Sequence, residues 1–173
     1  MEDLREQIRA QENALERIMR YIPGFSGYKD REQRRNADKI QRDYLAKLLE
    51  GERTRLQEVS LPLIRYGRLD DLNELDRAGS KLEKITDRIR HADYGYSGFF
   101  DSIKIGEQEL DKLYEHDLTL ISGVDSIKEA ILAVNAAIEQ NQELLSLTKS
   151  LEEKIDAFND CIDEREKLVP GVS

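Results

Sequence analysis

The chain has 173 residues, of which 36% are charged and 6% aromatic, and it carries a formal net charge of -9. Its length suits a single domain, and its small apolar and aromatic content suits amphipathic helices that share a narrow core. The charge is uneven, because residues 106–173 hold 6 Lys and Arg against 16 Asp and Glu, and such an acidic surface disfavours non-specific binding to nucleic acid and anionic membranes.

Residues 2–22 are expected to form an amphipathic helix. Apolar residues recur there at alternating spacings of four and three, which places them on one helical face. Pro23 ends the pattern, since a proline disfavours helical geometry at the residue before it, and Gly24 can adopt positive φ. In the loop that follows, Phe25 and Tyr28 are expected to pack against the end of the helices, and Asp30 is placed to cap the next one.

A second helix is predicted from residue 31 to about residue 60. Pro62 would remove an intrahelical hydrogen bond and clash with the preceding turn, so a kink or break is expected there. Four apolar side chains around this proline are expected to be packed: Leu61, Leu63, Ile64 and Tyr66. Gly67 closes the helix, and a third helix, capped by Asp70 or Asp71, is predicted to run to about residue 91.

Between residues 107 and 168 the main helix-breaking residue is Gly123. Apolar residues mark one helix up to Val124, and after Asp125 the apolar stripe restarts and continues from Ile127 to Ile162. The polar run at residues 139–142 is either a hairpin turn or a polar patch inside one long helix, and the absence of Gly and Pro favours continuity. One helix over residues 125–168 would be about 65 Å long at about 1.5 Å per residue, and its apolar face would need a partner.

The loop at residues 24–30 recurs 71 positions later, at residues 95–101. Both copies read Gly, aromatic, Ser, Gly, aromatic, any residue, Asp, and each lies between two predicted helices. Similar residues also align in the flanking helices, so two helix–loop–helix units are expected. The candidate structural or interaction residues of the loops are Gly24, Phe25, Gly27, Tyr28, Asp30, Gly95, Tyr96, Gly98, Phe99 and Asp101.

These patterns predict an all-α fold, with a bundle of four or five helices in one domain. Residues 1–66 are expected to form a first helical hairpin, residues 70–124 a second, and residues 125–168 a C-terminal helix or helical hairpin. No apolar stretch approaches the roughly 20 residues needed to span a bilayer, and no signal peptide is visible after Met1. A cytoplasmic protein without membrane insertion is therefore expected.

The sequence contains no recognisable motif for catalysis, a cofactor or a metal. Cys161 is the single cysteine, which excludes an intrachain disulfide and a multi-cysteine zinc site, and its acidic neighbours are expected to raise its pKa. His91 and His116 lack the spacing that places two ligands on one helical face, so we interpret them as surface residues. Each Gly-Ser-Gly loop ends in Asp, which would repel phosphate, and is therefore interpreted as a tight turn.

A basic cluster lies at the start of the second helix: Lys29, Arg31, Arg34, Arg35, Lys39 and Arg42. Such a cluster is a candidate site for nucleic acid, another anion or an acidic partner. Acidic residues are interleaved with it, however, and the four-residue spacings between Arg34, Asp38 and Arg42 are typical of ion pairs on a helix surface. We therefore interpret the cluster mainly as a solvated helix face.

The leading functional hypothesis is a non-enzymatic scaffold or adaptor that binds another protein, or a second copy of itself through the C-terminal stripe. One alternative is an enzyme or small-ligand carrier whose site lies between the two loops. A weaker alternative is a nucleic-acid or anion binder that acts through residues 29–42. The sequence identifies no specific partner or ligand.

Overall fold

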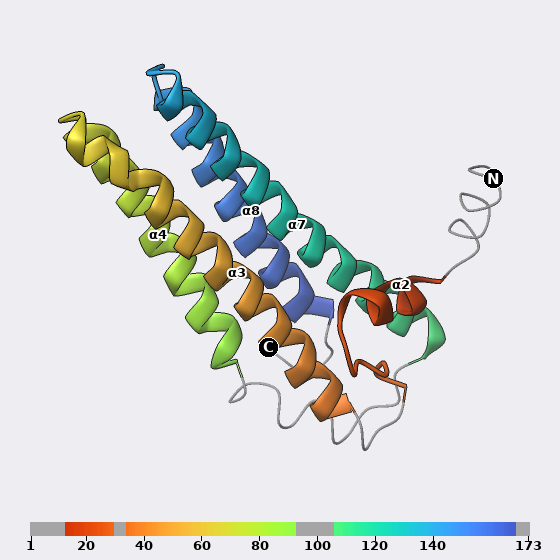
Figure 1. Ribbon diagram of the computed structural model, residues 1–173. Helices are drawn as coiled ribbons and strands as arrows, with labels where there is room; N and C mark the ends of the chain where they lie inside the picture. Colours follow the sequence, from red (N-terminus) through yellow and green to blue (C-terminus); the bar gives the residue numbers. More distant parts are fainter. Residues whose placement is uncertain (1–12, 30–33, 93–105, 169–173) are drawn as a thin grey trace.

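The computed structural model describes residues 13–29, 34–92 and 106–168, and all of its regular secondary structure in these ranges is α-helical (Figure 1). The predicted all-helical fold is therefore confirmed for the described part of the chain. Its helices are α2 (Ala14–Tyr21), α3 (Arg34–Arg65), α4 (Leu69–Arg90), α7 (Glu107–Glu139) and α8 (Leu145–Leu168). Predictions for residues 2–12, for Asp30 and Arg31, and for the second loop at residues 95–101 lie outside the described residues.

The four long helices form two antiparallel pairs that lie side by side (Figure 1). Helix α3 packs against α4, and α7 packs against α8; across the two pairs α3 contacts α7 and α4 contacts α8. The short helix α2 packs against α7. We call the end with the α3–α4 and α7–α8 turns the distal end, and the opposite end, where α2 lies, the proximal end.

The pairing differs from the predicted hairpins. In the described residues the main contacts of α2 are with α7, and those of α4 are with α3. Helix α7 also runs without interruption through Gly123 and Asp125. Gly123 lies under a ring of the neighbouring helix, where a Cβ would be 2.9 Å from Cδ2 of the buried Phe158.

Two helical glycines, Gly51 and Gly123, should therefore respond oppositely to alanine. Gly51 faces open space, because a Cβ at this position would have nothing within 4 Å, so Gly51→Ala should raise the free energy of unfolding by about 0.5–1 kcal/mol. Gly123→Ala has the same propensity gain but pushes on the Phe158 ring, and should lower that free energy by about 0.5–2 kcal/mol. Urea unfolding of the two variants measures both changes, and equal stabilisation by both would contradict the close packing at Gly123.

The open question about residues 125–168 is resolved by a hairpin turn. Asn141 adopts a left-handed backbone with φ of 53°. The backbone N–H of Gln142 donates to the Ala137 carbonyl at 2.8 Å, and that of Asn141 donates to the Ile138 carbonyl at 3.0 Å. This is the hydrogen-bond pattern of a Schellman C-cap, with Asn in the position usually taken by Gly. Continuity of the helix, which the absence of Gly and Pro favoured, was therefore wrong.

Helix α3 ends in the same way, beyond the predicted interruption. Gly67 has φ of 67°, and the N–H of Arg68 donates to the Leu63 carbonyl at 3.0 Å. The predicted break at Pro62 is absent, because α3 runs through it to Arg65. Pro62 lacks one backbone N–H, and the fully buried Leu63 beside it anchors this turn to the core.

The C-terminal apolar stripe is buried inside this arrangement. Side chains of α7 and α8 with 8% exposure or less include Ile127, Ile131, Val134, Ile138, Leu151, Ile155, Phe158 and Ile162. Their area is covered by the helices of the same chain, which supplies the main hydrophobic stabilisation. In this fold the stripe is not a free surface for self-association.

Candidate functional site

The first loop packs its aromatic residues into the proximal end, as expected. Phe25 and Tyr28 are buried, and their rings meet edge to face with centroids 5.2 Å apart. The Tyr28 ring stacks on Tyr114 of α7 at 5.5 Å, and the Tyr28 N–H donates to the Tyr114 hydroxyl at 2.9 Å. The loop thus attaches residues 13–29 to α7 through both ring packing and a buried hydrogen bond.

A buried ionic cluster lies beneath Tyr28. The Tyr28 hydroxyl donates to Oδ2 of Asp117 on α7 at 2.7 Å, and Nε of Arg165 on α8 donates to Oδ1 at 2.7 Å. Gln41 of α3 donates its amide to the same Oδ1 at 3.1 Å. Asp117 has no exposed surface and Arg165 only 5%. One carboxylate therefore connects the loop to three long helices.

A second carboxylate, Asp38 of α3, extends the cluster. It accepts from Arg165 Nη2 at 3.2 Å and from Arg42 Nε at 2.8 Å, and Arg42 Nη1 donates to the Ile89 carbonyl of α4 at 3.3 Å. Arg34 Nε donates to the Tyr28 carbonyl at 2.6 Å. The buried cluster consists of Tyr28, Arg34, Asp38, Gln41, Arg42, Asp117 and Arg165.

This arrangement corrects the interpretation of the basic residues. Arg34 and Arg42 are buried, whereas Arg35 and Lys39 are exposed. The predicted pair between Asp38 and Arg42 does form, but in the interior and not on a solvated helix surface. Two of the arginines therefore serve the packing of helices and are not available to a nucleic acid or another large anion.

Burial dominates the electrostatics of the cluster. It raises the pKa of Asp117 above its ordinary value, although the Arg165 guanidinium and the hydrogen bonds from Tyr28 and Arg165 act to lower it. Burial also raises the pKa of Tyr28 well above its ordinary value, and the Asp117 carboxylate adds to this rise. Tyr28 is therefore a neutral hydrogen-bond donor at physiological pH.

The space beside the cluster is small. A cavity of about 20 Å³, lined by residues that include Gln41, Arg42, Arg88 and Arg165, is large enough for about one water molecule. The Gln41 Oε1 atom is buried and, among the described residues, has no hydrogen-bond partner. The predicted ligand site between the two loops also depends on residues 95–101, which lie outside the described residues.

The structure brings together a cysteine and a histidine that the sequence left apart. Sγ of Cys161 on α8 lies 3.5 Å from Nδ1 of His116 on α7, and Nε2 of His116 lies 3.5 Å from Oε2 of Glu164. Burial raises the pKa of the Cys161 thiol to about 11, and the charges of Glu164 and Asp117 contribute to this rise. The thiol is thus protonated at neutral pH, unlike the thiolate of a catalytic cysteine.

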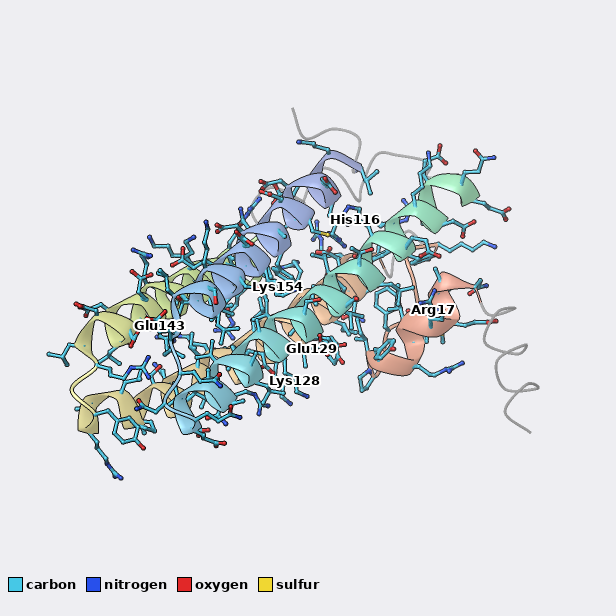
Figure 2. The ribbon with its side chains drawn as sticks, turned by 90° about the horizontal axis from the view of Figure 1, so that it is seen from above. Arg17, His116, Lys128, Glu129, Glu143 and Lys154 are labelled. Carbon is cyan, nitrogen blue, oxygen red and sulfur yellow. The ribbon has the colours of Figure 1, made fainter. Side chains whose placement is uncertain are left out.

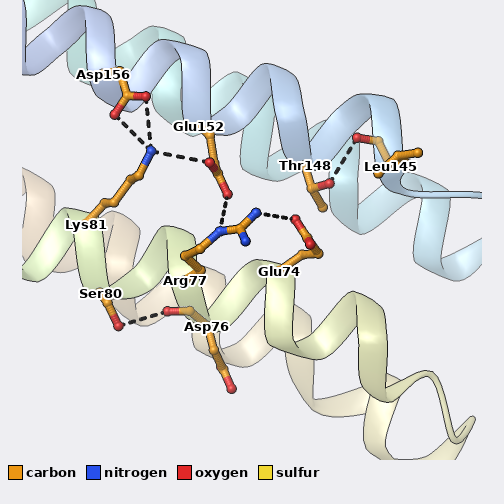
Figure 3. A network of polar contacts seen from close by, with 9 residues as sticks. All are labelled: Glu74, Asp76, Arg77, Ser80, Lys81, Leu145, Thr148, Glu152 and Asp156. Atoms are coloured by element: carbon orange, nitrogen blue, oxygen red, sulfur yellow. Dashed lines mark hydrogen bonds and ion pairs between the residues drawn. The ribbon is translucent and has the colours of Figure 1, made fainter.

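Charged residues also join α4 to α8, and Figure 3 shows the part of this contact around Arg77 and Lys81. Arg77 Nε donates to Glu152 at 2.9 Å, and Lys81 Nζ donates to Glu152 at 3.3 Å and to both oxygens of Asp156 at 3.0 Å. Partial burial alone would raise the pKa of Glu152, but the hydrogen bonds from Arg77 and Lys81 lower it below its ordinary value. Part of the acidic C-terminal region is therefore paired with basic residues of α4.

The distal end exposes apolar side chains that were expected to be packed. Leu61, Ile64 and Tyr66 are 61%, 57% and 60% exposed, and only Leu63 of the four predicted residues is buried. Leu69, the first residue of α4, and Leu145, the first residue of α8, are also largely exposed. The prediction of a packed region was wrong because α3 extends to the end of the fold, where no neighbouring element of the described chain covers these side chains.

The two distal turns are connected and line an open groove. Arg68 Nη2 donates to the Gln142 carbonyl at 2.9 Å, and Arg68 Nε pairs with Asp71 at 2.6 Å. The groove has a volume of about 470 Å³ and is lined by Arg68, Asp70, Asp71, Asn141, Gln142, Glu143, Leu144 and Leu145. Figure 2 shows Glu143 at this end of the molecule. The distal end thus combines an exposed apolar surface with a polar groove.

Comparison of the chain with protein-family models, curated proteins and solved structures gave no match. Within the described ranges, none of the helices combines the length and apolar character that a bilayer span requires. The same ranges contain no group of three or more His, Cys, Asp or Glu side chains arranged to hold a metal ion.

Proposed function

We propose that this protein is a non-enzymatic cytoplasmic scaffold or adaptor that binds another protein through its distal end. The observation that supports this proposal is the set of exposed apolar side chains at the two distal turns: Leu61, Ile64, Tyr66, Leu69 and Leu145. They belong to two turns that a hydrogen bond from Arg68 holds together. Large apolar side chains that several helices expose at the same end of a fold are a candidate site for binding another protein.

The exposure is not explained by a shortage of core. The helices bury a continuous apolar interior, and residues next to the exposed ones, such as Leu63 and Leu144, are almost fully buried. Tyr66 adds a large amphipathic ring, a residue type that is enriched at interaction hot spots. The distal end therefore has the composition expected of an interface with another protein.

Site-specific photocrosslinking in the native host tests this proposal. With p-benzoyl-phenylalanine in place of Tyr66, we expect a discrete crosslinked protein, which is then purified and its affinity measured directly. The variant Leu61→Lys/Ile64→Lys should bind this partner at least about tenfold more weakly, because charged side chains replace apolar contacts of the interface.

The matched control is Leu132, an apolar side chain on α7 that is also 45% exposed. The crosslinker at position 132 should not capture the same protein, and Leu132→Lys should leave its affinity within about twofold. Equal capture from positions 66 and 132, or equal affinities of the two lysine variants, would remove the distal end as the binding surface.

We also propose that the chain is built from two helix–loop–helix repeats, α2–α3 and α4–α7, within one helical bundle. The contacts support this idea, because α2 lies against α7 as α4 lies against α3, while α3 and α7 contact each other. This is the pattern that a pseudo-twofold relation between the repeats would give. Equivalent positions such as Ile18 and Ile89 are both buried.

A further inference from the structure

We propose that the distal groove receives a basic amphipathic segment of the partner protein, whose Lys or Arg side chains pair with Asp70 and Glu143. This inference rests on the proposed function, and it adds the chemical class of the partner surface. Three features support it: the charge of the groove, the position of its apolar residues, and the internal pairing of Arg68.

The groove has an excess of negative charge. It contains Asp70, Asp71 and Glu143 but a single cationic side chain, Arg68. Arg68 Nε donates to Asp71 and Nη2 donates to the Gln142 carbonyl, whereas Nη1 is buried and has no hydrogen-bond partner among the described residues. In the described part of the chain, Asp70 and Glu143 take part in no ion pair. A partner that brings positive charge is therefore complementary to this surface.

Apolar side chains next to these carboxylates define the rest of the partner. Leu145 lines the groove with 71% exposure, and the buried Leu144 contributes to its floor. Exposed Leu69 directly precedes Asp70 in the chain. Apolar side chains thus lie in and beside the acidic groove, so the matching segment presents apolar and basic side chains close together, as a basic amphipathic helix does.

A second copy of the chain is a poorer occupant. Two copies that meet at their distal ends would bring Asp70 and Glu143 of one close to the same carboxylates of the other, and like charges across an interface oppose association.

The test uses the purified full-length chain and a fluorescein-labelled amphipathic helical peptide of Leu and Lys, with a Leu and Glu peptide as its counterpart. Fluorescence anisotropy gives the affinity, and amide chemical-shift changes locate the site. We expect the Leu/Lys peptide to bind and to shift signals of the two distal turns. Asp70→Asn/Glu143→Gln should weaken this binding about three- to tenfold.

The control variant Glu129→Gln/Asp160→Asn removes the same charge from exposed positions on α7 and α8 that lie outside the groove. Its affinity should stay within about twofold of the unmodified protein. Equal weakening in both variants would reduce the binding to general attraction by an acidic protein and would overturn the proposal. Equal binding of the Leu/Glu peptide would overturn it as well.

The two proposals fail separately. If the crosslinker at position 66 captures a partner but the Leu/Lys peptide does not bind, the distal end binds protein and only the basic nature of the segment is overturned. If the same amide signals shift when the chain itself is concentrated, the occupant is a second copy, and this inference is again overturned. If the peptide binds the groove but the crosslinker at position 66 captures no partner, the groove assignment stands and the scaffold function is overturned.

Discussion

Replacing Asp117 with alanine is expected to lower the free energy of unfolding by about 3–5 kcal/mol, among the largest effects of any substitution in this chain. Asp117 is fully buried and accepts hydrogen bonds from Tyr28, Gln41 and Arg165. Without the carboxylate, two neutral donors and part of a buried guanidinium lose their acceptor in the interior of the fold. Unfolding in urea, followed by circular dichroism, measures the loss.

A double-mutant cycle separates this network from simple loss of packing. Arg165→Ala should also be strongly destabilising, since it leaves Asp117 and Asp38 with less compensating charge. The double variant Asp117→Ala/Arg165→Ala should lose less than the sum of the single variants, because neither charge is then left without the other. Asp160→Ala is the surface control, and it should change stability by at most about 0.5 kcal/mol. Additive losses would contradict coupling within the buried cluster.

The same residue predicts a pH dependence with a definite sign. Burial raises the pKa of Asp117 in the folded state, so the folded chain holds this proton more tightly than the unfolded chain. The contribution of this group to stability is full below the unfolded pKa and is lost as pH rises through the folded pKa. Asp117→Asn should remove this pH-dependent contribution. As pH rises between the unfolded and folded pKa values of Asp117, the free energy of unfolding of the variant should therefore fall less than that of the unmodified protein.

The apolar periodicity of the sequence predicted the helices well because it depends on local spacing alone. The burial of the stripe from Ile127 to Ile162 follows from this spacing, whereas the burial of Phe25 and Tyr28 in the first loop was predicted from their large aromatic side chains. Periodicity also predicts that polar residues are exposed, so it does not predict a buried cluster of polar and charged side chains. Arg165 lies 48 residues from Asp117 and 137 from Tyr28, so no local pattern connects them.

The turns and the distal surface were missed for different reasons. Asn141 ends α7 because it tolerates a left-handed backbone, which makes it a weaker signal than a glycine in the sequence. Leu61, Ile64 and Tyr66 look like core residues by composition. Whether an apolar residue is buried depends on which neighbouring helix extends far enough to cover it, and this long-range packing cannot be predicted from local sequence patterns. The feature that best supports the proposed function is thus one that only the packed fold reveals.

Gly27→Val is expected to lower the free energy of unfolding by about 3–5 kcal/mol, through backbone strain and steric overlap together. Gly27 has φ of 89°, a conformation that a β-branched residue strongly disfavours. A Cβ at this position would also lie 2.8 Å from the hydroxyl oxygen of Tyr114 and 3.1 Å from Cδ1 of Leu15. The first loop would have to move, and Tyr28 would be displaced from the buried cluster.

Two further variants divide this loss into its causes. Gly27→Ala retains the strain and the contact with Tyr114, and should cost about 2–3 kcal/mol. Adding Tyr114→Phe removes the overlapping hydroxyl, so the double variant should lose less stability than the sum of the two single variants. The backbone strain and the lost hydrogen bond from the Tyr28 N–H remain in it.

Gly67→Ala provides the control. Gly67 also has a positive φ, of 67°, but a Cβ there would have nothing within 4 Å, so this variant carries strain without overlap. If Gly27→Ala and Gly67→Ala were equally destabilised, the loop would not be held against the Tyr114 hydroxyl as tightly as the structure indicates.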